Sequence, residues 1–90
     1  MLEKVKLALR IKTTAFDTEI EDLIEAGKLD LKTFAGITIK ENDYLIERAI
    51  CTYCKLNFGD PQNYEKLKAS YDEQKAQLLL SSEYGRGPSG

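Results

Sequence analysis

Two cysteines are the residues whose type and spacing come nearest to a chemical site. Cys51 and Cys54 stand three positions apart, so on a helix their thiols share a face, as in a redox pair or half of a zinc site. A thioredoxin-type pair belongs at a helix N-terminus near a βαβ unit, and a closed zinc site needs four ligands. The chain has no histidine and no other cysteine. We therefore expect buried or half-buried structural thiols and no metal.

The acidic residues are a second place to look for chemistry. Glu19, Glu21, Asp22 and Glu25 cluster near the start of an expected helix, where carboxylates favour the positive helix end and the solvated face. General acid–base catalysis needs carboxyls held in a cleft with shifted pKa values, and no such pair is marked here. The sequence also lacks a glycine-rich phosphate loop. We expect no enzyme activity and no cofactor.

The carboxyl-terminal aromatic residue indicates a contact with another protein. Tyr84 follows the last expected helix, where we expect no core position for it, and tyrosine is favoured as an anchor in interfaces. Three successive leucines precede it and point around most of a helix, so at least one should be exposed. The predicted partner-binding residues are Leu79, Leu80, Ser81, Ser82, Glu83 and Tyr84.

Apolar residues at steps of three and four predict four helices that would carry these side chains. The expected ranges are 2–10, 17–34, 43–58 and 61–80. Gly27 lies inside the second range, where glycine costs about 1 kcal/mol relative to alanine. A close crossing by another helix would explain it, and a local break is the alternative.

Local signals predict where these helices begin and end. We expect Asp17 or Thr18 to cap the second helix and Asn42 or Asp43 to cap the third. Gly36 should end the second helix, and residues 37–39 should form a loop. Residues 58–61, Phe-Gly-Asp-Pro, should end the third helix and start the fourth, with the aspartate as its cap.

The third helix is expected to lie at the centre of the core, because apolar residues dominate one of its faces. That face carries Ile46, Ala49, Ile50, Tyr53, Cys54 and Asn57. Tyr64, Leu67, Tyr71 and Leu78 are the expected inward residues of the fourth helix. Phe34 is assigned to the apolar stripe of the second.

Length and composition limit the architecture. Ninety residues with 42% hydrophobic and 31% charged side chains predict one globular domain. The fold class is all-α, a small bundle of four helices in residues 1–80. Residues 81–90 lose the helical period and gain glycine, serine and proline, so we expect a flexible carboxyl-terminal tail.

Charge and hydropathy indicate where the protein works. Thirteen lysines and arginines against fifteen acidic residues give a net charge of −2, which disfavours a grip on phosphates or anionic lipid. No apolar run approaches the ~20 residues that span a bilayer, and residues 1–10 do not read as a signal peptide. We expect no membrane contact and a cytoplasmic site of synthesis.

Several blocks along the chain, in this order and spacing, resemble the head-tail connector family of tailed bacteriophages and prophages. The blocks are residues 2–11, Asp17 with 20–26, 43–50, 53–59, and Tyr71 with 79–84. The resemblance covers residues 2–84. It does not account for Gly27 or for the paired cysteines.

The resemblance implies a structural adaptor of the virion neck. Such proteins form a homo-oligomeric ring of sister subunits that joins the portal protein to a tail-completion protein, with DNA passing through the hole without specific binding. The alternative is a small helix-turn-helix DNA-binding packaging protein, whose recognition helix should present clustered basic or amide side chains. The third helix instead carries Glu41, Asp43 and Glu47 beside Arg48.

Overall fold

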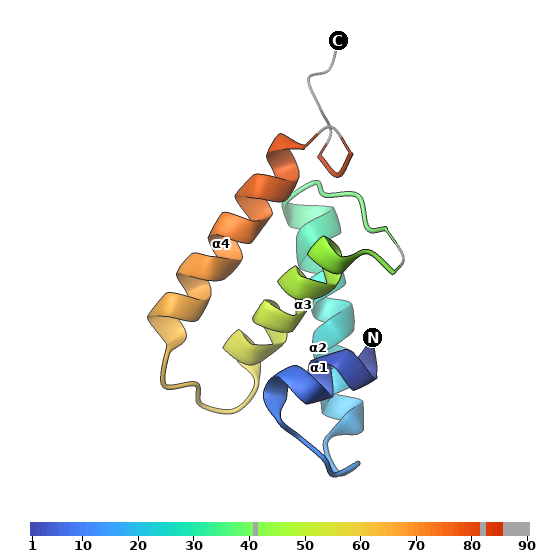
Figure 1. Ribbon diagram of the computed structural model, residues 1–90, viewed down its shortest axis with the longest axis vertical. Helices are drawn as coiled ribbons and strands as arrows, with labels where there is room; N and C mark the ends of the chain where they lie inside the picture. Colours follow the sequence, from blue (N-terminus) through green and yellow to red (C-terminus); the bar gives the residue numbers. More distant parts are fainter. Residues whose placement is uncertain (41, 82, 86–90) are drawn as a thin grey trace.

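The structure, a computed structural model, describes residues 1–40, 42–81 and 83–85. The elements are α1 (Leu2–Leu9), α2 (Asp17–Leu29), the π-helical turn η1 (Asp30–Phe34), α3 (Tyr44–Asn57) and α4 (Tyr64–Leu80) (Figure 1). The part of the chain that the structure describes contains no strand. The predicted all-α class and the four helices are confirmed.

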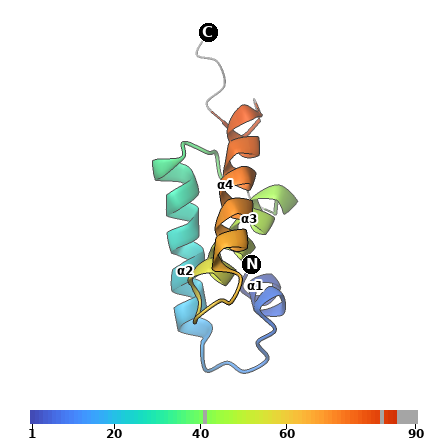
Figure 2. The same cartoon turned by 90° about the vertical axis from the view of Figure 1, so that its left-hand side faces the viewer.

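Helix α3 is the central element, because it contacts α1, α2 and α4 (Figures 1 and 2). Ile46, Ala49 and Ile50 on α3 are completely buried, as the apolar face predicted. Around them the other helices contribute apolar side chains that form one continuous core. The core comprises Val5, Ile20, Ile24, Leu31, Ile37, Ile46, Ala49, Ile50, Cys54, Leu56, Tyr71, Leu78 and Tyr84.

The junction between α1 and α2 differs from the expected cap. The N-cap of α2 is Phe16, and no side chain accepts a hydrogen bond there. Asp17 forms an ion pair with the buried Lys6, with Oδ1 and Nζ 2.8 Å apart. The prediction of an Asp17 or Thr18 cap was wrong, since the Asp17 carboxylate is used to neutralise a lysine ammonium that α1 places in a buried position.

Gly27 lies where α2 crosses α3, which confirms the predicted close approach. A β-carbon built at Gly27 would lie 3.1 Å from Cδ1 and 3.3 Å from Cγ of Tyr53 on α3. The helix continues through this point without a break. Glycine therefore lets the two backbones come closer than a side chain would allow.

The end of the second helical segment widens into the π-turn η1 and then stops at glycine. Gly36 has φ 74°, and the following amide of Ile37 donates to Leu31 O at 2.8 Å. Phe34 is 82% exposed, so its predicted place on the buried stripe was wrong. The π-turn adds a residue to the helical repeat, which rotates Phe34 away from the face that carries Ile24 and Leu31.

Helix α4 begins three residues later than the sequence predicted. Its N-cap is Asn63, and no side chain caps it, so the expected cap at Asp60 was wrong. Tyr64 is 47% exposed rather than in the core. The first turns of α4 contribute only the partly buried Leu67, whereas Tyr71 and Leu78 further along the helix are buried against the bundle.

Candidate functional site

The segment after α4 folds back onto the start of α3, and Tyr84 fixes it there. The Tyr84 hydroxyl donates to Asp43 Oδ2 at 2.6 Å, and its carbonyl accepts from the Thr38 amide at 2.6 Å. The Lys40 ammonium lies 4.6 Å from the centre of the Tyr84 ring. Tyr84 is only 6% exposed and belongs to the core. The prediction that no core position awaits Tyr84 was wrong, because the 37–43 connection and α3 form one.

Asp43 joins this segment to α3 by using both carboxylate oxygens. Its Oδ1 accepts from the amides of Leu45 at 2.9 Å and Ile46 at 3.2 Å, which caps α3 as predicted. Its Oδ2 accepts from Tyr84. The Tyr84 hydroxyl is the main reason that the pKa of Asp43 is lowered, and the two amides lower it further. The same hydrogen bond raises the pKa of Tyr84 to about 12.

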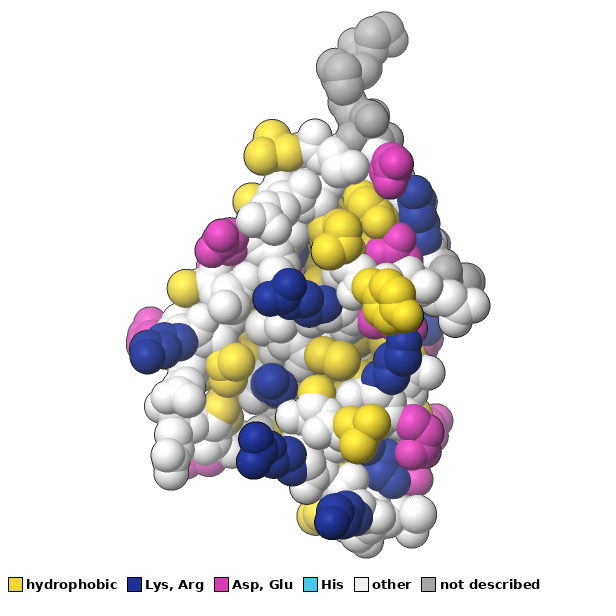
Figure 3. Space-filling view, in the orientation of Figure 1, with side chains coloured by type: hydrophobic (Ala, Val, Ile, Leu, Met, Phe, Trp, Pro, Cys, Tyr) yellow, Lys and Arg dark blue, Asp and Glu magenta, His cyan; other side chains and the backbone are white. Residues whose placement is uncertain are grey.

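A pocket of about 340 Å³ opens where α3, α4 and the terminal segment meet. A second hollow of about 230 Å³ continues it along the junction of α3 and α4, and Arg48 borders both. The face that carries them is shown in Figure 3, where Lys and Arg side chains gather over the middle and lower part. The first pocket is lined by Leu45, Arg48, Gln74, Gln77, Leu78, Ser81, Glu83 and Tyr84.

The structure divides the predicted partner-binding residues into two groups. Leu80 is 87% exposed and Leu79 is also exposed, which confirms that the leucine run cannot be buried on all sides. Ser81, Glu83 and Tyr84 line the pocket instead. Ser82 lies outside the described residues. Leu45, at the start of α3, adds an exposed apolar side chain on the pocket wall.

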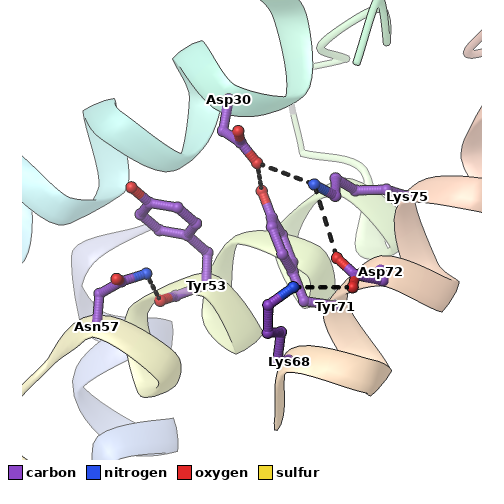
Figure 4. Close-up of polar contacts among 7 residues, drawn as sticks. All are labelled: Asp30, Tyr53, Asn57, Lys68, Tyr71, Asp72 and Lys75. Atoms are coloured by element: carbon purple, nitrogen blue, oxygen red, sulfur yellow. Dashed lines mark hydrogen bonds and ion pairs between the residues drawn. The ribbon is translucent and has the colours of Figure 1, made fainter. Parts of the chain in front are cut away.

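A polar cluster ties the end of α2 to α4 (Figure 4). The Tyr71 hydroxyl donates to Asp30 Oδ2, and Lys75 Nζ lies 3.4 Å from the same oxygen. Lys75 also approaches Asp72 Oδ1 at 3.9 Å and lies over the Tyr71 ring. Burial, and then the bond to Asp30, raise the pKa of Tyr71. Tyr71, Asp30 and Lys75 contact one another, so the cluster stabilises the packing of α4 against the end of α2.

The cysteine pair has the environment expected of structural thiols. Cys54 is buried in the core and Cys51 is half-buried. Burial raises the pKa of Cys54 to about 12 and also raises that of Cys51, which disfavours the reactive thiolate form of both side chains. Within residues 1–40, 42–81 and 83–85, no three His, Cys, Asp or Glu side chains are grouped to hold a metal ion.

The sequence did not mark two residues that shape this site. Asp43 was expected only as a helix cap, and its bond to Tyr84 joins positions 41 apart, a separation for which helical periodicity gives no signal. Arg48 was noted only as a single basic residue, yet it borders both hollows. Arg48 is exposed, whereas most other positions of α3 are buried or partly buried.

Comparison with known proteins identifies one family. A family model described as phage connector protein matches residues 1–85. The match includes all four helices, η1 and the segment that carries Tyr84. No curated protein and no solved structure matched the chain. In the described part of the chain, no helix is long and apolar enough to cross a membrane.

Proposed function

The chain belongs to the phage connector protein family, and from this premise we propose that it is an adaptor subunit of a tailed-phage neck. It is a structural protein and not an enzyme. Copies of the chain form a ring that joins the portal protein to a tail-completion protein, and DNA passes through the ring. The family match over residues 1–85 carries this proposal.

The surface of the single chain supports a role in contacts. Soluble monomers rarely expose large contiguous apolar patches, and such patches mark binding surfaces. Leu79 and Leu80 are exposed at the end of α4, and the exposed Leu45, at the start of α3, lines the pocket. A neighbouring component that covered them would remove apolar area from water, at roughly 25 cal/mol per Å².

Within this proposal, residues 79–84 contact a neighbouring neck component. Leu79 and Leu80 supply the exposed apolar surface, and Ser81, Glu83 and Tyr84 shape the pocket next to it. The inclusion of Ser82 rests on the sequence alone. Since Tyr84 is already held by Asp43, its part is to hold the terminal segment in a binding geometry before the partner arrives, which lowers the entropic cost of binding.

The charge of the chain is compatible with a conduit for DNA. A ring that gripped phosphates with many lysines and arginines would hold the genome through counterion release. The net charge of −2 gives each subunit no overall attraction for DNA. The proposed ring therefore lets the genome pass without binding it specifically.

Electron cryo-microscopy of purified particles tests this function. The expected result is a ring of this chain directly below the portal, and particles made without the chain should lack that layer. Leu80→Asp should reduce attachment of the next tail component while leaving the melting temperature of the isolated chain unchanged, because Leu80 is exposed. Lys68→Asp, on the same helix, is the matched control. Absence of the chain from the neck would reject the proposed function.

A further inference from the structure

The outer face of α2 is acidic. Ile20, Ile24 and Gly27 are the buried residues of this helix. At about 100° per residue, Asp22, Glu25 and Leu29 project from the opposite side. All three are exposed, and Leu29 adds an apolar side chain to the row. Among the residues that the structure describes, Glu25 is the one of these with an ion-pair partner, Lys28 at 3.3 Å, in the kind of exposed pair that contributes little.

The outer face of α3 is basic. Tyr53 marks the side of α3 that meets α2, since it contacts Gly27. Arg48 and Lys55 both lie about 140–160° around the helix from Tyr53, so they face away from α2. Both are exposed. Neither forms an ion pair with any residue that the structure describes.

These two surfaces lie on opposite sides of the molecule. Figure 2 shows α2 on one side and α1 with α3 toward the other, and Figure 1 shows α2 behind α3. A contact between different surfaces on opposite sides of identical subunits is head-to-tail. Repetition of such a contact gives a closed ring when the rotation closes.

We propose that the outer face of α2 on one copy binds the α3–α4 groove of the next copy. The groove is defined by Leu45, Arg48 and the pocket wall formed by Leu78 and Tyr84, and Glu83 and Glu73 also border its two hollows. Lys55 lies on the outer face of α3 outside these hollows. Asp22 and Glu25 meet the basic side chains, and Leu29 enters the apolar pocket. This proposal rests on the proposed ring and names the contact that builds it.

The order of the residues along the two helices supports an antiparallel contact. At about 1.5 Å per residue, Glu25 is about 6 Å from Leu29 along its helix, and Arg48 is about 4.5 Å from Leu45. Asp22 lies about 10.5 Å from Leu29, and Lys55 about 15 Å from Leu45. The difference between the Asp22–Leu29 and Lys55–Leu45 distances is small enough for the flexible lysine side chain to span. When Leu29 occupies the pocket beside Leu45, Glu25 therefore faces Arg48 and Asp22 approaches Lys55.

Charge reversal in particles tests this contact. A phage whose only source of the chain is a plasmid would carry Glu25→Arg, Arg48→Glu, or both, and the amount of chain retained in purified particles would be measured. Each single variant should reduce retention about tenfold, because it places like charges opposite each other. The double variant should return to within about threefold of the native chain, since the pair is restored in reverse.

Two controls separate this contact from folding and from the proposed function. Lys66→Glu, an exposed reversal on α4 outside both surfaces, should retain normal incorporation, and thermal melts of each isolated variant should match the native chain. The proposed contact is wrong if the single variants are incorporated normally, or if the double variant is retained no better than the single variants. The proposed function would still stand in that case, provided that the native chain forms a ring in the neck. If the native chain is missing from the neck, the function itself fails.

Discussion

Asp43 and Tyr84 form the contact on which the carboxyl-terminal surface depends. One carboxylate caps α3 and also holds the segment that follows α4. A charged acceptor strengthens a hydrogen bond, and here two amides and one hydroxyl share it. The shape of the pocket, which Ser81, Glu83 and Tyr84 line, is therefore linked to the protonation of a single residue.

The pH dependence of Tyr84→Phe tests this link. The pKa of Asp43 is lowered from 3.8, so its contribution to stability is present above pH 3.8 and is lost as the pH falls through the lower folded value. The pKa of Tyr84 is raised from 10.0 to about 12, so its contribution is present below pH 10 and is lost as the pH rises toward 12. The variant should melt below the native chain between pH 4 and 10, with the gap narrowing on both sides.

Tyr44→Phe is the matched control, because Tyr44 is exposed and its hydroxyl has no hydrogen-bond partner among the described residues. It should follow the native melting curve at every pH. A difference for Tyr84→Phe that stays constant from pH 2 to 12 would mean that the Asp43 bond does not hold the segment.

Among the elements, the crossing of α2 and α3 sets how closely these two helices approach each other. Tyr53 occupies the space that a side chain at Gly27 would need. Its ring centre is also 5.5 Å from that of Tyr71 on α4, and Tyr71 bonds to Asp30 at the end of α2. Three helices thus meet around two tyrosines, and a change at Gly27 is transmitted to all of them.

Gly27→Val should destabilise the chain by about 1–3 kcal/mol in denaturant unfolding, the usual cost of overpacking. Its β-carbon would be in tight contact with Tyr53, and that ring cannot retreat freely because it packs on Tyr71. Glu21→Val, an exposed position on the same helix, controls for the helix propensity of valine. Equal stability of the two variants would show that the crossing tolerates a side chain.

At the scale of the whole molecule, charge is separated between faces while the total stays near zero. Acidic residues occupy the outside of α2, and Arg48 and Lys55 occupy the outside of α3. Such a distribution favours attraction between copies over attraction to a polyanion.

Duplex DNA should therefore bind weakly at physiological salt and without preference for sequence. A titration with labelled duplexes at several salt concentrations would measure the affinity and its salt dependence. A shallow salt slope is expected, since few phosphates would be neutralised. Submicromolar, site-selective binding would contradict this and favour the helix-turn-helix alternative.

Much of the fold could be predicted from local sequence patterns. The four helices, the Asp43 cap, the glycine stop at Gly36 and the close approach at Gly27 each depend on residues a few positions apart, or on one residue's own backbone freedom. The same patterns predicted that Cys51 and Cys54 would be structural and that the leucine run before Ser81 would be partly exposed.

The tertiary structure decided what the period of a helix leaves open, namely which neighbour covers each face. Tyr84 became a core residue because Thr38, Asp43 and Lys40, distant in sequence, surround it. Tyr64 and Phe34 are exposed because none of the elements that the structure describes packs closely over them. Periodicity identifies an apolar side of a helix, whereas burial and the pairing of surfaces depend on contacts between segments some forty residues apart, which only the folded chain brings together.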